Sequence, residues 1–174
     1  MQLVAYLEAN NLLPRYQSAY RHHHSTETAV LNIISDVLYA AEQGEVTLVG
    51  MLDMSAAFDT VDHDILLGRL QTSFGICGTT LSWFSSFLRD RTQTVVINSQ
   101  RSKTSLVTSG VPQGSVLGPI LFILYTADIR LIAEKHGINF HSYADDSELY
   151  VHYKAHVAAV TCSRVVPCIR DINN

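Results

Sequence analysis

The chain has 174 residues, of which 47% are hydrophobic and 16% are charged, and its net charge is −4. This composition is typical of one globular domain and excludes a disordered chain. The longest strongly apolar stretch, residues 116–125, is too short to span a membrane, which takes about 20 residues. We therefore expect no membrane partner. Three cysteines without metal-ligand spacing predict reduced thiols and an intracellular protein, with nuclear and cytoplasmic locations both open.

Hydrophobic spacing in the first third of the chain predicts two helices and a strand. Residues 3–10 are expected to form a short helix. A longer helix follows, for which Ser25 and Thr26 both offer an N-cap, and it ends before Gly44. Residues 45–53 are a near-continuous apolar run, which is typical of a strand buried on both faces. We therefore expect this strand at the centre of a sheet, with Asp53 at its end.

The rest of the chain alternates helices with antiparallel hairpins. The predicted helices cover residues 63–74, 81–88, 116–136 and 155–174, and the predicted hairpins cover residues 92–107 and 138–152. The second hairpin turns tightly at Ala144-Asp145-Asp146. This order predicts an α+β fold, with helices packed on one face of a small antiparallel sheet.

Three acidic residues stand where strands end: Asp53, Asp145 and Asp146. Adjacent carboxylates repel each other, and a charged carboxylate in a low-dielectric setting is costly unless something pairs with it. A solvated turn would explain a lone Asp-Asp pair, but here a third acid ends a strand that should be adjacent. A divalent cation among the three explains the grouping, and ligation by oxygen alone suits Mg²⁺. The pattern indicates two-metal phosphoryl transfer.

Residues 109–114 form a glycine-containing loop that leads into a helix with Pro119 in its first turn. Such a loop exposes backbone N–H groups, which can seat a phosphate or the edge of a nucleotide. An ordinary loop with Ser115 as the helix N-cap explains the same residues equally well. From the loop alone both interpretations stay open.

Three segments, residues 52–59 (LDMSAAFD), 109–119 (SGVPQGSVLGP) and 143–146 (YADD), carry a family resemblance. In order and spacing they resemble palm motifs A, B and C of reverse transcriptases, and they are most similar to the non-LTR retrotransposon (LINE-like) group. Residues 16–21 (YQSAYR), followed by Ser25-Thr26, resemble that group's fingers segment. The resemblance covers nearly the whole chain. It implies one reverse transcriptase domain over residues 1–174, a palm with part of the fingers and no thumb, truncated at both ends.

The resemblance also implies an activity and its catalytic residues. The expected reaction is RNA-directed DNA synthesis, in which two metal ions assist transfer of a dNTP to a primer 3′-OH. Asp53 and Asp145 resemble the metal-holding pair, Asp146 the third acid, and the Met54 carbonyl an additional ligand. The implied cofactor is Mg²⁺, with Mn²⁺ as its substitute, and the implied partners are an RNA template, a DNA primer and dNTPs.

Four further residues resemble the family's nucleotide-binding positions. Phe58 resembles the steric gate whose ring crowds a ribose 2′-hydroxyl. Gln113, with Pro112 and Gly114 beside it, resembles the motif B residue that contacts the incoming nucleotide and the template. Asp59 introduces an ambiguity, because RNA-dependent RNA polymerases use an acid shortly after the motif A aspartate to accept the ribose hydroxyl. Phe58 and the sequences of motifs B and C favour DNA synthesis.

The net charge of −4 conflicts with nucleic-acid binding, which usually needs a basic surface. The family's basic upstream segment, later palm motifs, thumb and endonuclease have no counterpart in these residues, which would account for the charge. We therefore expect weak or no polymerisation by this chain alone. The alternative function is an inactive remnant that persists as a folded nucleic-acid-binding or protein-binding module, or as an inert product. An RNA polymerase or a group II intron-type maturase with the same palm is a third interpretation.

Other clusters favour structural roles. The consecutive histidines 22–24 cannot all face one ion, so they predict a solvated loop. In Asp62-His63-Asp64, the first residue is explained as a helix N-cap. No nucleophile elbow is present, which argues against a hydrolase triad. The aromatic residues Trp83, Phe84 and Phe87 at helical spacing are predicted to lie in the core.

Overall fold

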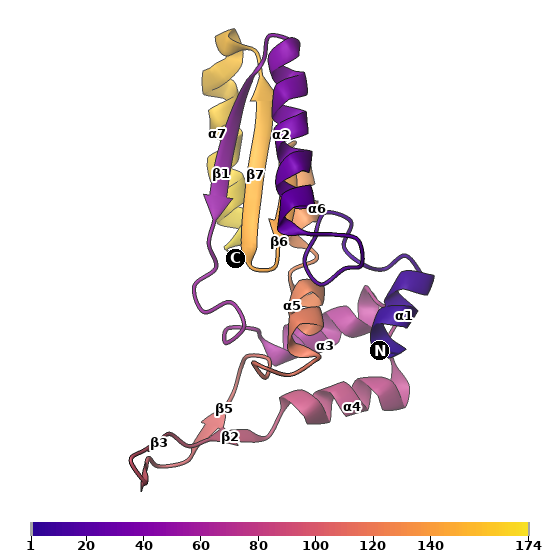
Figure 1. The fold of residues 1–174 in the computed structure, drawn as a ribbon, viewed down its shortest axis with the longest axis vertical. Helices are drawn as coiled ribbons and strands as arrows, with labels where there is room; N and C mark the ends of the chain where they lie inside the picture. Colours follow the sequence, from indigo (N-terminus) through magenta and orange to yellow (C-terminus); the bar gives the residue numbers. More distant parts are fainter. Residues whose placement is uncertain (1, 174) are drawn as a thin grey trace. The chain divides into compact units, whose positions relative to one another are not determined.

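The structure is a computed structural model that describes residues 2–173. These residues form two compact units, and each unit combines separate stretches of the sequence. The sheet unit consists of residues 14–55 and 126–173, and the helical unit consists of residues 2–13 and 56–125. Figure 1 labels the elements of both units. That residues 1–174 make up a single domain stays a prediction.

The sheet unit is built on three antiparallel strands in the order β1-β7-β6. Their bounds are Val46–Leu52 for β1, Asn139–Tyr143 for β6 and Asp146–Tyr153 for β7. The predicted hairpin of β6 and β7 is confirmed, but β1 is an edge strand and not the central one. Val49 and Met51 of β1 are 44% and 85% exposed. An apolar run indicates that both faces of a strand are apolar. It does not indicate whether other strands pair with both edges of that strand, so it does not distinguish a central strand from an edge strand.

Helices cover both faces of this sheet, and not one face as predicted (Figure 1). Adjacent strand residues point to opposite faces. Leu149 of β7 belongs to a buried apolar cluster with Cys168 of α7 (Ala158–Ile172) and Ala133 of α6 (Ile129–Lys135). Its neighbour Tyr150 donates a hydrogen bond of 2.6 Å to the carboxylate of Asp36 in α2 (Thr26–Glu42). Periodicity shows that a helix has an apolar side, but not which face of the sheet that side meets.

The ends of these helices follow their sequence signals. Ser25 caps α2 in a capping box, in which its Oγ accepts the N–H of Thr28 and its own N–H binds the Thr28 hydroxyl. A 3₁₀ turn, η1 (Ala155–Val157), precedes α7. Of the two predicted cap candidates, Ser25 is the N-cap and Thr26 is the first residue of α2.

The helical unit contains α1 (Gln2–Ala9), α3 (His63–Thr72), α4 (Gly78–Leu88) and α5 (Gly118–Tyr125). Helix α3 packs against both α4 and α5. Buried side chains along these three helices include Leu66, Leu70, Phe84, Leu88, Leu121 and Leu124. The expectation that Trp83 lies in the core is wrong, because its side chain is 52% exposed and stacks on Phe87.

The single long helix predicted over residues 116–136 is divided into α5 and α6. The chain leaves the helical path at residues 126–128, which is also where the helical unit ends. The carbonyl of Tyr125 accepts a hydrogen bond from the guanidinium of Arg69. That bond satisfies a carbonyl at the C-terminus of α5 and so stabilises the end of the helix.

A hairpin spans residues 91–107 of the helical unit, as predicted. It has two short ladders, β2 (Arg91–Gln93) with β5 (Ser105–Val107) and β3 (Val96–Ile97) with β4 (Gln100–Arg101). Asn98 and Ser99 form its tip, with φ values of 46° and 68°. Positive φ at both central residues is typical of the turn that suits the twist of a two-residue hairpin.

The mixture of helices and antiparallel strands confirms the α+β class. Within residues 2–173, no helix has the length and apolar character needed to cross a membrane.

Candidate active site

The three predicted metal-binding acids lie at one end of the sheet. The last pair in the β1–β7 ladder is Leu52 with Ser147. Asp53 follows Leu52 and Asp146 precedes Ser147, so one further step in this register places Asp53 opposite Asp146. Asp145 occupies the two-residue turn between β6 and β7. Pairing of β7 with both neighbours thus brings acids from distant parts of the sequence to the same sheet end.

The turn that contains Asp145 is stabilised by a side chain that does not belong to the hairpin. Ala144 has a φ of 57°, the positive value that the first central residue of such a turn requires. Its N–H donates to Oε1 of Gln17 at 2.9 Å, and its carbonyl accepts from Nε2 of Gln17 at 3.0 Å. Sequence reasoning places Gln17 in a fingers segment but gives it no role at the acids.

The three carboxylates are open to a ligand. Asp53 and Asp146 are exposed and Asp145 is half-buried. Over residues 2–173, none of the three carboxylates has a hydrogen-bond or ion-pair partner. Free carboxylate oxygens are the ligands that Mg²⁺ prefers, so the chemistry of this donor set fits a divalent cation. No three His, Cys, Asp or Glu side chains in the described part of the chain are already close enough together to hold one.

Negative charge at this sheet end affects two neighbouring groups. Burial, and then the charges of Asp145 and Tyr143, raise the pKa of the Tyr20 hydroxyl. Burial, and then the charge of Asp146, raise the pKa of the Glu148 carboxyl. Oε2 of Glu148 is buried and has no hydrogen-bond partner among the described residues. A cation at the sheet end would relieve this accumulation of negative charge.

In the helical unit, the segment of residues 109–111 packs closely against residues 58–61 and is hydrogen-bonded to their backbone. Gly110 has a φ of 85°, and a Cβ there would lie 2.9 Å from both Cα and O of Asp59. Three hydrogen bonds of 2.8 Å join the segments: Gly110 N–H to Val61 O, Val111 N–H to Phe58 O, and Ser109 Oγ to Asp59 O. The close approach requires glycine at position 110.

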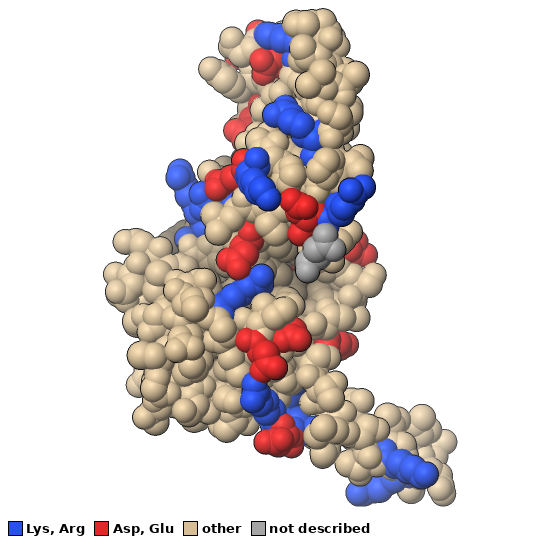
Figure 2. All heavy atoms as spheres, turned by 180° about the vertical axis from the view of Figure 1, so that it is seen from behind, with Lys and Arg blue, Asp and Glu red and all other residues tan. Residues whose placement is uncertain are grey.

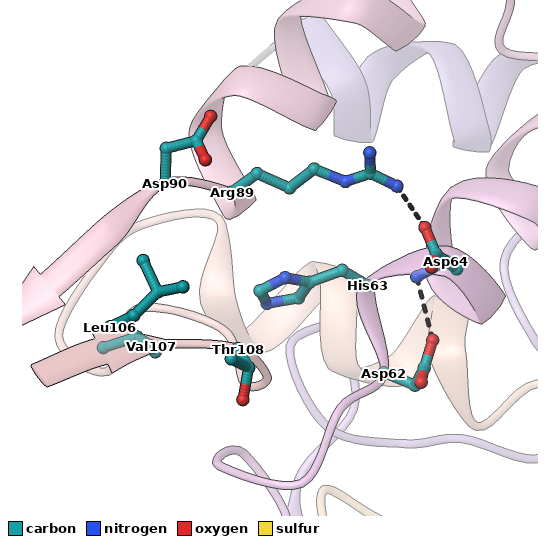
Figure 3. Close-up of a pocket in the computed structure, with 8 residues that line it drawn as sticks. All are labelled: Asp62, His63, Asp64, Arg89, Asp90, Leu106, Val107 and Thr108. Carbon is teal, nitrogen blue, oxygen red and sulfur yellow. Dashed lines mark hydrogen bonds and ion pairs between the residues drawn. The ribbon is translucent and has the colours of Figure 1, made fainter.

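The carbonyl of Gly110 accepts two further hydrogen bonds, from His63 Nε2 at 2.9 Å and from the guanidinium of Arg91 at 2.5 Å. Because a carbonyl only accepts, Nε2 of His63 carries the proton in this tautomer. Figure 3 shows the His63 ring between the Arg89–Asp64 ion pair and strand β5. Asp62 accepts the N–H groups of Asp64 and Ile65. This confirms its predicted role as the N-cap of α3.

A hollow of about 450 Å³ lies along the 109–113 loop, lined also by Asp59, Arg91 and Thr92. Two of its lining residues are hydrogen-bonded to each other: Gln113 Nε2 donates to Asp59 Oδ1 at 2.8 Å. A carboxylate only accepts, so this bond orients the Gln113 amide with its nitrogen toward Asp59. Oε1 of Gln113 has no donor among the described residues and is free to accept a hydrogen bond.

Phe58 lies at the start of the same backbone contact. Its half-buried ring stacks on that of Phe122 in α5, with centroids 4.7 Å apart and an interplanar angle of 29°. Its carbonyl accepts the N–H of Val111. The helical unit therefore brings Phe58, Pro112 and Gln113 to neighbouring loops.

Pro112 and Ser115 shape the entry into α5. The Pro112 carbonyl accepts from the Ser115 hydroxyl at 2.6 Å, and Ser115 Oγ accepts the N–H of Gly118 at 2.9 Å. Ser115 Oγ thus accepts the N–H of the first residue of α5, but Ser115 lies three residues before the helix and is not its N-cap residue, so both interpretations of the loop stay open. Gly114 has a φ of 78°, and a Cβ there would meet nothing within 4 Å. Met54 is half-buried in the segment after β1, and its carbonyl as a metal ligand stays a prediction.

Two clusters contain residues whose importance the sequence did not reveal. Gln17 acts through its side chain on the backbone of Ala144, which is 127 positions away. His63 and Arg91 act on the carbonyl of Gly110. Every residue has a backbone carbonyl, so the sequence does not indicate which side chain binds a particular one. Only the three-dimensional contacts identify these residues.

Charge on the surface is mixed. Figure 2 shows Lys and Arg interspersed with Asp and Glu over the face that it draws. Ion pairs among the described residues include Arg89 with Asp64, Arg130 with Glu134, Lys135 with Asp171, and Lys154 with Glu45. These pairings reduce the positive charge that is available to phosphates.

Known proteins that are similar to this chain include RNA-directed DNA polymerases of mobile elements. The family model described as reverse transcriptase (RNA-dependent DNA polymerase) matches residues 1–171. A probable RNA-directed DNA polymerase from transposon BS of Drosophila melanogaster is 33% identical over 143 residues, 79% of this chain and 16% of the relative. The RNA-directed DNA polymerase from mobile element jockey of the same species is 28% identical over 165 residues, 92% of this chain and 18% of the relative.

Among solved structures, an apo telomerase from Candida tropicalis superimposes with a TM-score of 0.68 at 17% identity. The match covers 97% of this chain and 36% of the telomerase chain, and it confirms the palm-like fold. The chain spans less than a fifth of the two Drosophila relatives. Its resemblance to the LINE-like group is confirmed by those relatives, and the chain belongs to the reverse transcriptase (RNA-dependent DNA polymerase) family.

Proposed function

We propose that this chain carries the catalytic centre of an RNA-directed DNA polymerase of retrotransposon origin, which transfers dNTPs to a primer 3′-OH. The observation that carries the proposal is the strand register. Pairing of Leu52 with Ser147 brings Asp53 to Asp146, beside the turn that holds Asp145. Three open carboxylates at one sheet end match the ligand needs of Mg²⁺, and Mn²⁺ can replace it.

Each acid has a proposed role. Asp53 and Asp145 hold the metal ions, Asp146 adds charge beside them, and the Met54 carbonyl completes the ligand set. Bound divalent ions would supply charge stabilisation for the attacking 3′-oxygen and the departing pyrophosphate. The protein's own contribution is positioning, because phosphoryl transfer relies almost wholly on geometry and electrostatics.

The loop residues have a proposed role in binding the incoming nucleotide and template. Gln113 presents a free carbonyl oxygen, held in place by Asp59. Pro112 and Gly114 keep the backbone of this loop in a fixed path toward α5. Phe58 is the proposed gate against a 2′-hydroxyl. In the sequence Asp59 is the residue that favours RNA synthesis, but its Oδ1 is engaged by Gln113, which supports Phe58 as the selecting group.

The test is primer extension on an RNA template with a DNA primer, dNTPs and Mg²⁺. An extended chain, in which these residues are part of a longer polymerase, should extend the primer, and Asp145→Asn, which removes the charge but keeps the size, should abolish extension. The present chain should extend poorly, because it carries 12 basic residues against 16 acidic ones. If the extended chain is inactive under conditions in which it binds primer and template, the polymerase proposal fails.

A second candidate, a folded module without catalytic activity, is favoured by the ion pairs that engage basic side chains such as Arg89, Arg130 and Lys154. It predicts nucleic-acid or protein binding that does not change when Asp53 and Asp145 are replaced. Extension that depends on Asp145 would exclude it.

A further inference from the structure

The amide of Gln17 is a deeply buried polar group beside the turn that carries Asp145. Gln17 is 3% exposed. Its Nε2 donates to the carbonyl of Ala144, and its Oε1 accepts the N–H groups of both Ala144 and Ala19. A buried amide with both ends satisfied by backbone groups is fixed in orientation.

The backbone around Gln17 is itself held against the sheet. The N–H of Ser18 donates to the carbonyl of Ser142 at 2.9 Å, and the N–H of Ser142 donates to the carbonyl of Tyr16 at 2.8 Å. Residues 16–18 thus pair in parallel with the end of β6. Beyond the end of β6, the backbone groups of the turn bind the side chain of Gln17 and not the backbone of residues 16–18.

The turn needs such support. Ala144 lies in the left-handed region, which is unfavourable for a residue with a Cβ. In a two-residue hairpin turn, the N–H and carbonyl of the first central residue take no part in the ladder between the strands. Gln17 binds both of these groups, and the next residue of the chain is Asp145.

We propose that Gln17 is a positioning residue that fixes the Ala144-Asp145 turn and thereby sets where the Asp145 carboxylate meets a metal ion. The metal part of this inference rests on the proposed function. The turn part rests only on the hydrogen bonds between Gln17 and Ala144, so it can be tested without a metal ion.

The first test uses the 174-residue chain without ligand and measures hydrogen exchange of the Ala144 amide. Gln17→Met keeps the size of the side chain but removes all three hydrogen bonds, so protection of Ala144 should fall roughly tenfold or more. Ser18→Ala is the matched control. It removes the hydrogen bond between Ser18 Oγ and His141 Nε2 from the same buried segment and leaves both bonds to Ala144 in place.

The second test measures Mn²⁺ affinity of the same variants by electron paramagnetic resonance of the free ion. Residues that orient metal ligands typically change metal affinity by about 10- to 100-fold when they are replaced. Gln17→Met should therefore weaken Mn²⁺ binding roughly tenfold, and Ser18→Ala should leave it within about twofold. A role limited to stability would lower the melting temperature of both variants and leave the affinity of both unchanged.

The outcomes separate this inference from the proposed function. Unchanged Ala144 protection in Gln17→Met, or Mn²⁺ affinity equal to that of the unmodified chain, overturns the role of Gln17. If the unmodified chain binds no Mn²⁺ at its acids, the proposed metal site fails, and the exchange measurement still decides whether Gln17 fixes the turn. Should Gln17→Met not fold, Gln17→Asn decides the same question, because its shorter amide cannot reach both groups of Ala144.

Discussion

Leu52 of β1 and Ser147 of β7 are the last residues to pair before the acidic end of the sheet. This pair determines the position of Asp53 relative to Asp146. Because side chains alternate between faces along a strand, a slip of one residue in the register would turn Asp53 to the other face. The arrangement of the acids therefore depends on the whole β1–β7 ladder and not on the acids alone.

Gly110 and Gly114 both have positive φ, but only Gly110 has no room for a side chain. Gly110→Ala would place a Cβ 2.9 Å from the backbone of Asp59, so we expect a loss of about 2–5 kcal/mol in the free energy of unfolding. Gly114→Ala meets open space and should lose only about 1 kcal/mol. Urea unfolding of the two variants checks this difference. Equal losses of unfolding free energy in the two variants would mean that the 109–111 loop does not pack against the backbone of Asp59 as described.

The hydrogen bond between Asp59 and Gln113 can be tested by reversing it. Asp59→Asn keeps an oxygen acceptor but removes the charge, Gln113→Glu sets two carboxylates against each other, and the double variant restores a donor facing a carboxylate. We expect a coupling energy of about 0.5–1.5 kcal/mol in the double-mutant cycle, measured from unfolding free energies. Asp90→Asn, an exposed acid outside this pair, is the control for the change in charge. Additive effects of the two substitutions would show that the bond does not orient Gln113.

Phe58 should affect both stability and sugar selection. Phe58→Ala removes the stack on Phe122, and for this half-buried ring we expect a loss of about 1–3 kcal/mol. In a longer polymerase chain that contains these residues, the same change should lower discrimination against ribonucleotides by at least roughly tenfold. Phe122→Leu is the control, because it disturbs the stack but keeps the proposed gate. If Phe58→Ala leaves discrimination unchanged, the gate lies elsewhere.

His141 should make stability depend on pH. It is buried, its Nε2 lies 3.1 Å from Ser18 Oγ, and burial lowers its pKa below the usual 6.5, with the charge of Asp36 opposing and that of His24 adding to the effect. The unfolded chain then takes up a proton at higher pH than the folded chain does. Stability should fall as the pH drops from about 6.5 through the lowered pKa.

Melting temperatures at about pH 7.5 and about pH 5.5 measure this dependence. His141→Gln should reduce the difference between the two values, and His156→Gln, at an exposed position, should not. The same pH dependence in all three proteins would contradict a buried neutral His141.

Local sequence signals predicted the elements better than their arrangement. Turn and cap residues such as Ser25, Asp62 and the Ala144-Asp145 turn act on their immediate neighbours, and the structure has them where the pattern indicated. The position of β1 at the sheet edge and the break at residues 126–128 depend on which surfaces meet in three dimensions. Periodicity does not contain that information. The role of Gln17 was missed for the same reason, since its partners are backbone groups far along the chain.

The place where a divalent ion binds decides whether the acidic sheet end is a metal site. Mn²⁺ broadens the NMR signals of nearby amides, and it can be added in substoichiometric amounts to the 174-residue chain. We predict that the amides of Asp53 and of residues 145–147 broaden first, and that Asp53→Asn with Asp145→Asn abolishes the effect, whereas Asp62→Asn with Asp90→Asn does not. Broadening centred on Asp62 and Asp90, or broadening at the sheet end that survives the loss of Asp53 and Asp145, would contradict the proposed metal site.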